Sequence, residues 1–167
     1  ALLRAASLLE DANQKVTVYQ KAIEKFNSDR AKINLGVAYL VIGKNAEAEN
    51  ALASVSDKNC AYYNNAMGVV ANLAVIDILN GNYTDAAAKL NGAASFNEAL
   101  VNILNGNLDA ASNILSDAQC PCKNYLKAII AARQGNVEAA NAALETASKD
   151  EALAERAEND IEFAKIR

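Results

Sequence analysis

Histidine is absent from this chain of 167 residues, and its absence narrows the possible chemistry. Without an imidazole the chain has no common general base, lacks the usual zinc ligand, and contains no Ser-His or Cys-His nucleophilic pair. Its glycines are isolated and form no phosphate-cradling loop, and no two carboxylates are spaced as an inward-facing pair. The sequence therefore predicts a non-enzymatic protein with no catalytic residues, no metal site and no cofactor.

A basic cluster and a long apolar run are also missing. The net charge is −4, and the Lys and Arg residues are scattered. Nucleic-acid binding requires a basic stripe that neutralises phosphates, and a membrane span requires about 20 apolar residues. The sequence thus argues against nucleic acid as a partner and against membrane insertion, while it leaves the oligomeric state open.

Tryptophan is absent, proline occurs once, and aromatic residues supply only 5% of the chain. By contrast, hydrophobic residues make up 52%, and many of them are alanine, the best helix former. A chain of this length can bury a sizeable core as one domain. This composition predicts an all-α protein with closely packed helices.

Four copies of one ten-residue phrase organise the chain. Each copy reads Gly, a polar residue, three variable residues, Ala, three more and Leu, and the copies span residues 43–52, 81–90, 106–115 and 135–144. The Gly is expected to close one helix in a left-handed turn, and the Ala and Leu to begin the apolar stripe of the next. Seven positions before each Gly stands a small residue that lets two helices approach closely, namely Gly36, Ala74, Ala99 and Ala128. The phrase predicts helix hairpins that must stack on one another to bury their faces.

The stretch 35–52 resembles the tetratricopeptide repeat, through Gly36, Tyr39, Gly43, Ala48 and Leu52. The last copy, 125–144, matches nearly as well, and the two middle copies keep Gly, Ala and Leu but lose the Tyr. The resemblance covers roughly residues 14–148. It implies a right-handed α-solenoid of antiparallel helix hairpins, with about eleven helices in all.

The phrase glycines lie 38, 25 and 29 residues apart, whereas the family has a period of about 34. The spacing predicts one long helix over 60–80 and one short helix between Ser95 and Asn105. Asp150 is expected to cap a last helix whose inner stripe includes Ile161. The predicted divisions are a partial N-terminal repeat at 1–28, repeats at 29–59, 60–94, 95–119 and 120–148, and a capping helix at 149–167.

In the family, first-helix residues line a concave groove, and the resemblance implies that a protein or peptide segment binds there. The carried-over groove residues are Arg30, Ile33, Val37, Leu40, Ala71, Val75, Ile78, Tyr125, Ile129 and Arg133. Family members that clamp a terminal carboxylate place Lys and Asn where this chain has apolar residues, so we expect an apolar helix or extended peptide instead. The alternative is that neighbouring helices cover these residues. The module would then be a spacer or oligomerisation element of a larger envelope protein.

The three cysteines, Cys60, Cys120 and Cys122, admit three interpretations. Free cysteine is usually buried, so the sequence favours small apolar packing residues at helix starts. A disulfide is the second interpretation, although a Cys-Pro-Cys ring is strained and Cys60 lies roughly two repeats away. A metal or redox role is the third, but three thiolates without histidine make a poor zinc site.

The chain opens directly in a helical pattern without an initiator methionine. We therefore expect an excised or processed piece of a longer protein, so the absence of a targeting segment from this sequence decides little. Its abundant asparagine and its Asn-Gly pairs suggest a bacterial source. We expect the periplasm or cell envelope rather than the cytoplasm.

Overall fold

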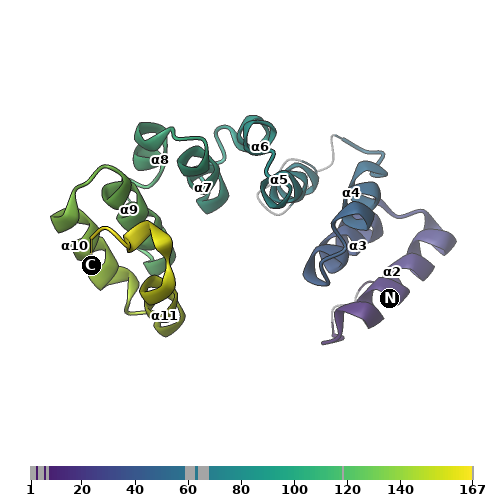
Figure 1. Ribbon diagram of the computed structural model, residues 1–167. Coiled ribbons are helices and arrows are strands. Elements are labelled where there is room, and N and C mark those ends of the chain that lie inside the picture. Colours follow the sequence, from purple (N-terminus) through teal and green to yellow (C-terminus); the bar gives the residue numbers. More distant parts are fainter. Residues whose placement is uncertain are drawn as a thin grey trace. The chain divides into compact units, whose positions relative to one another are not determined.

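The computed structural model describes residues 3, 6, 8–58, 63, 68–117 and 119–166. Over these residues the protein is all-α, as predicted, with ten α-helices, one 3-10 turn and no strand (Figure 1). The chain divides into two compact units, an N-terminal unit over residues 1–90 and a C-terminal unit over residues 91–167.

The N-terminal unit contains five α-helices within its described residues. They are α2 (Ala12–Phe26), α3 (Asp29–Val41), α4 (Asn45–Ala53), α5 (Val69–Leu79) and α6 (Tyr83–Leu90). Helices α3 and α4 pair as one hairpin and α5 and α6 as the next, while α2 packs on α3 and α5 packs on α4. Consecutive hairpins within this unit are therefore in direct contact.

Among its described residues, the C-terminal unit contains five more α-helices and the 3-10 turn. They are α7 (Phe96–Leu104), α8 (Leu108–Ile114), α9 (Pro121–Arg133), α10 (Val137–Ala147), α11 (Glu151–Asn159) and η1 (Ile161–Phe163). Helix α9 contacts α7, α8 and α10, and also α11 and η1. It is thus the central helix of this unit.

The repeated phrase acts as its pattern predicted. Its glycines close the hairpins with φ of +74° to +79°, a region that favours glycine. The phrase alanines are fully buried in all four copies, at Ala48, Ala86, Ala111 and Ala140. The leucines of the first three copies are buried as well, and Leu144 in the last copy is half-buried. The Ala and Leu positions therefore form the packing seam between the helices of each hairpin.

Two predicted helix starts are confirmed by their caps. Ser95 Oγ accepts a hydrogen bond from the backbone N–H of Glu98, so the predicted short helix begins at Phe96 and ends at Leu104. Asp150 Oδ1 accepts from the backbone N–H of Leu153 at the start of α11. Both use the oxygen of a short polar side chain to satisfy an otherwise unpaired helix donor.

Two predicted helices differ from the structure. The helix expected over 60–80 is described only from Val69, because Gly68 is extended and forms the N-cap; residues 59–62 and 64–67 lie outside the described part. The last helix ends at Asn159, because Asp160 adopts an extended conformation and starts a 3-10 turn. The expectation that Ile161 lies on the inner stripe is wrong, since its side chain is 86% exposed.

The carboxylate of Asp29, at the first position of α3, ties the loop after α4 to this helix. It accepts hydrogen bonds from the backbone N–H groups of Ser56, at 3.2 Å, and Asp57, at 2.9 Å, and pairs with Lys32 at 2.9 Å. These donors, Lys32 first, hold the pKa of the Asp29 carboxyl well below its usual range. The folded state therefore favours the ionised form.

Asp29→Asn is expected to lower the free energy of unfolding near neutral pH by about 1 kcal/mol, because ionic hydrogen bonds become neutral ones. The folded pKa lies below the unfolded value of about 4, so this stabilisation is complete above that value and is lost as the pH falls toward the folded pKa. Urea unfolding at about pH 7 and about pH 3 is expected to show the gap between the two proteins narrowing at the lower pH. Asp85→Asn, which removes the same charge from the first turn of α6, controls for net charge. A gap of equal size at both pH values would contradict this role of Asp29.

Candidate functional site

In the N-terminal unit, α2 and α3 border an open hollow of about 450 Å³. Three of the predicted groove residues, Arg30, Ile33 and Val37, line it along α3, and Val41 continues the same stripe. These positions recur every three or four residues, which places them on one face of the helix. Val37 and Val41 are 38% and 72% exposed, so this stripe presents apolar surface to solvent. We call the stripe of Arg30, Ile33, Val37 and Val41 the α3 face.

The opposite wall of the hollow combines apolar surface with charges of both signs. Ala12, Lys15 and Tyr19 come from α2, and Glu10 comes from the segment before it. Lys15 and Arg30 both border the hollow, so it contains two cations and one carboxylate. Lys15, Tyr19 and Val41 were missed by the sequence prediction, which took selected positions from the first helix of each repeat and none from the helix before it.

The remaining groove residues of this unit are partly covered. Leu40 is half-buried and packs against the cluster formed by α3, α4 and α5. Ala71, Val75 and Ile78 are half-buried along α5. The structure therefore gathers three of the seven predicted groove residues of the N-terminal unit around one hollow, and it distributes the other four over partly covered surfaces.

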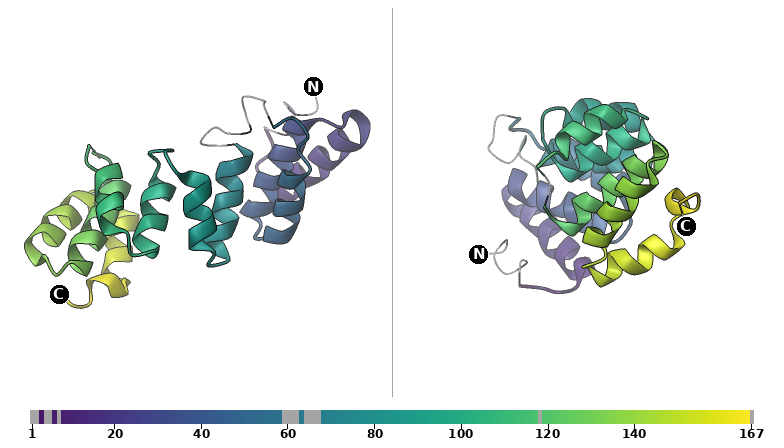
Figure 2. Two further views of the ribbon diagram at one scale, coloured as in Figure 1. Left: turned by 90° about the horizontal axis from the view of Figure 1, so that it is seen from above. Right: turned by 90° about the vertical axis from the view of Figure 1, so that its left-hand side faces the viewer.

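The corresponding face of α9, in the C-terminal unit, is covered by the protein itself. Tyr125, Ile129 and Arg133 stand ten, six and two residues before Gly135, as Ile33, Val37 and Val41 stand before Gly43. Tyr125 and its counterpart Ile33 are both buried. The two faces differ at the next position, where Ile129 is buried and Val37 is exposed. In Figures 1 and 2 the C-terminal segment, drawn in yellow, lies beside α9 and α10.

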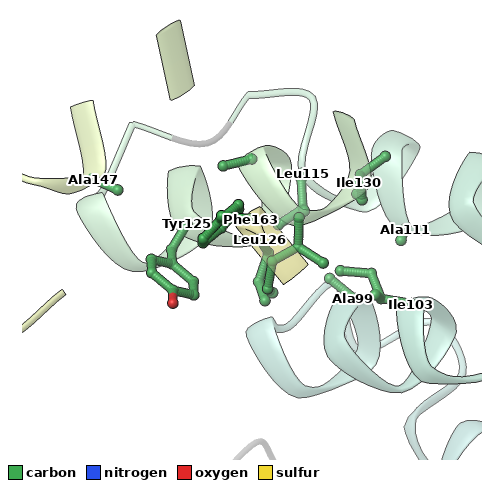
Figure 3. Packing of buried hydrophobic residues seen from close by; sticks show 11 residues of the cluster. Ala99, Ile103, Ala111, Leu115, Tyr125, Leu126, Ile130, Ala147 and Phe163 are labelled. Carbon is green, nitrogen blue, oxygen red and sulfur yellow. The ribbon is translucent and has the colours of Figure 1, made fainter. Parts of the chain in front are cut away.

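Phe163, in η1, makes the central contact of this cover. Its side chain is 1% exposed, and its ring meets that of Tyr125 edge-on, with the ring centroids 5.4 Å apart (Figure 3). Buried aromatic pairs of this geometry stabilise beyond their burial alone. The sequence prediction placed Ile161 inside and omitted Phe163, because it continued the helical period through Asp160.

Two carboxylates complete the cover. The Tyr125 hydroxyl donates to Asp160 Oδ2 at 2.7 Å, and burial together with this bond raises the pKa of Tyr125 to about 12. The Arg133 guanidinium pairs with Glu162 and donates to the backbone carbonyl of Ile103. An Asp-Ile-Glu-Phe segment thus covers an apolar helix face with one aromatic ring and two acids.

The cysteines differ from the favoured interpretation as buried packing residues. Cys120 is half-buried and Cys122 is exposed, at the start of α9. Their Sγ atoms are 3.0 Å apart. Cys60 lies outside the described residues.

Within the residues that the structure describes, no group of three or more Cys, Asp and Glu side chains is placed to hold a metal ion. None of the described helices has the length and apolar character needed to cross a lipid bilayer. Neither a known protein-family model nor a curated protein matches this sequence, so the residues and geometry given above are what bear on the site.

Proposed function

We propose that this protein is a non-enzymatic binding module, built as a short right-handed solenoid of the tetratricopeptide type, that holds a protein or peptide segment on the α3 face. The hairpins α3–α4 and α5–α6, which contact each other, support the repeat assignment within the N-terminal unit. The hairpins of the C-terminal unit support it in the same way.

One observation carries the proposal: equivalent faces of the two units differ in whether the chain covers them. On α9, Phe163 and Glu162 occupy the face that includes Tyr125 and Arg133. On α3, the same register borders an open hollow. Because the chain covers this face in one repeat, we infer that the same face binds a separate segment in the repeat where it is open.

The cover on α9 also indicates the chemistry of the partner. It is a short segment, residues 160–163, in which two carboxylates precede one aromatic side chain. The hollow by the α3 face has a buried apolar floor at Ile33. Two cations, Lys15 and Arg30, outnumber the one carboxylate, Glu10, along its border. We therefore propose an acidic peptide segment with a single aromatic anchor as the occupant.

A fluorescent peptide with the sequence of residues 159–166 tests this chemistry directly. We expect it to bind the protein, and Val37→Glu to weaken binding by about tenfold or more, because the new carboxylate repels the probe and polarises the apolar floor. Fluorescence anisotropy at low salt measures the affinity. A second peptide with the Phe163 position changed to Ala is expected to bind weakly.

Leu79→Glu is the matched control, since Leu79 is an exposed apolar residue of the same unit, 59% exposed, that does not line the hollow. It is expected to leave peptide affinity unchanged, and circular dichroism confirms that both variants remain folded. Equal affinities of the Val37→Glu, Leu79→Glu and unaltered proteins for the peptide would overturn the assignment of the α3 face.

A structural spacer or oligomerisation role is the second candidate, and the covered face of α9 favours it. The chain's own segment occupies that face, so Tyr125 and Ile129 are buried there and are not available to a ligand. Light scattering separates the two roles: concentration-dependent assembly through the α3 face, abolished by Val37→Glu without any peptide binding, would favour the second.

A further inference from the structure

Cys120 and Cys122 are held together by the start of α9. Cys120 is the N-cap residue, with φ of −76° and ψ of 150°, and Pro121 occupies the first position of the helix. Proline is preorganised for this position, and its ring also favours an extended residue before it. The Cys120 carbonyl accepts hydrogen bonds from the backbone N–H and the side-chain amide of Asn124, which fixes the helix start further.

This local geometry brings the two thiols into direct contact. The Cys120 Sγ and Cys122 Sγ atoms are 3.0 Å apart, against about 2.05 Å in a disulfide bond. Bond formation therefore requires a displacement of only about 1 Å. Cys122 is exposed and Cys120 is half-buried, so a reagent in solution reaches the pair.

The two thiols are electronically unequal. The hydrogen bond from Cys122 lowers the pKa of the Cys120 thiol, and the backbone N–H and charge of Lys123 add to this effect. The same contact is the main cause that raises the pKa of the Cys122 thiol, and burial adds to it. A pair with one thiolate and one protonated partner divides the roles of attacking and resolving thiol.

The repeat itself does not demand a second cysteine. The phrase Ser-Asp-x-x-Cys occurs at 56–60 and again at 116–120, where x is variable. Two positions after the cysteine, the first copy has Tyr62 and the second has Cys122. The thiol pair is therefore particular to the second occurrence of this phrase.

We propose that Cys120 and Cys122 form a redox-active dithiol that exchanges with disulfides in solution, an activity beyond the peptide binding proposed above. The Cys120 thiolate attacks one sulfur of the disulfide, a mixed disulfide forms, and one thiolate leaves. Cys122 then releases its proton to water and attacks the Cys120 sulfur, so that the second thiolate leaves. The protein has formed an internal disulfide by losing two electrons, and the substrate disulfide has been reduced to two thiols.

The short ring makes this disulfide a carrier of electrons and not a structural cross-link. Two cysteines separated by one residue close a small loop, so the bond constrains little of the unfolded chain. Strained and exposed disulfides are the readily reduced ones. The reduced pair is thus regenerated by an ordinary thiol.

A small aromatic disulfide, 5,5′-dithiobis(2-nitrobenzoate), tests the proposal on the full chain with Cys60→Ser as background. We expect two equivalents of the coloured thiol per protein and no adduct, with the protein lighter by two hydrogen atoms in intact mass spectrometry. Cys122→Ser in the same background is expected to release one equivalent and keep the adduct, because no resolving thiol remains. Dithiothreitol is expected to restore the starting mass.

Cys120→Ser is the matched control for the roles of the two thiols. Its remaining thiol is expected to react several-fold more slowly than that of Cys122→Ser, and circular dichroism shows that each variant is folded. Two stable adducts on the Cys60→Ser protein, or equal attack rates for the two single-thiol variants, would overturn the proposal.

Discussion

Phe163→Ala is expected to destabilise the C-terminal unit by about 3 kcal/mol, at the lower end of the range for buried phenylalanine. The side chain is 1% exposed, and its ring packs on Tyr125 within the main cluster of this unit. The lower end applies because η1 is a single turn of three residues that is able to open locally, which limits the cavity that remains. The α9 face is expected to open as the segment detaches.

Hydrogen exchange and the titration of Tyr125 measure this effect separately. Amides of α9 are expected to exchange faster, and the pKa of Tyr125 is expected to fall from about 12 toward its ordinary value, because burial and the Asp160 hydrogen bond are lost together. The chain has six tyrosines, so a Tyr125→Phe protein identifies the signal in an ultraviolet titration. Ile161→Ala is the matched control, since Ile161 is 86% exposed two residues away and its loss is expected to cost less than about 0.5 kcal/mol. If Phe163→Ala and Ile161→Ala changed the amide exchange of α9 and the pKa of Tyr125 equally, the buried position of Phe163 would be refuted.

Gly36→Ala is expected to destabilise the N-terminal unit by about 1 to 2 kcal/mol, although alanine is the better helix former. An added Cβ would lie 2.6 Å from Leu52 Cγ and 3.3 Å from the Ala48 carbonyl oxygen. Leu52 is fully buried, so it has little room to move. The loss from overpacking therefore exceeds the gain of about 1 kcal/mol in helix propensity.

A double-mutant cycle with Leu52→Ala separates the steric cause from a backbone effect. Leu52→Ala alone is expected to cost about 3 kcal/mol, and in that background Gly36→Ala is expected to become stabilising by up to about 1 kcal/mol. Gly43→Ala is the comparison, because Gly43 has open space around it and a φ of +74°. Its cost is expected to be the same in both backgrounds. Urea unfolding followed by circular dichroism measures all six proteins, and an unchanged cost of Gly36→Ala in the Leu52→Ala background would contradict the steric explanation.

The hairpins were predictable because their signals are local. A glycine in the left-handed region and an Ala–Leu stripe follow from spacing along the chain, and they agree with the structure at Gly43, Ala48 and Leu52. The caps at Ser95 and Asp150 were predictable for the same reason, since a short polar side chain bonds a donor two or three residues away. Signals of this kind need no knowledge of the tertiary fold.

The candidate site was predictable only in part. The carried-over register identified Ile33 and Val37, but the hollow also needs Lys15 and Tyr19 from a different helix. Similarly, an acid in the first turn of a helix is a common pattern, and Asp29 and Glu98 both fit it. Each carboxylate also accepts hydrogen bonds from a loop outside its own helix, which the pattern does not predict. Glu98 does so by accepting from the backbone N–H groups of Gly92 and Ala94, which binds the chain before α7. Such contacts depend on where the loops return.

By itself, the sequence determined the helical class and the hairpin seams, because each depends on residues within a few turns of one another. Only the tertiary structure decided which helix faces are open and which are covered. Tyr125 and Ile33 hold the same place in their repeats, yet Phe163 covers the first, and the second borders a hollow. The physical reason is that burial depends on which segment folds back over a face, and a ten-residue pattern carries no record of that segment.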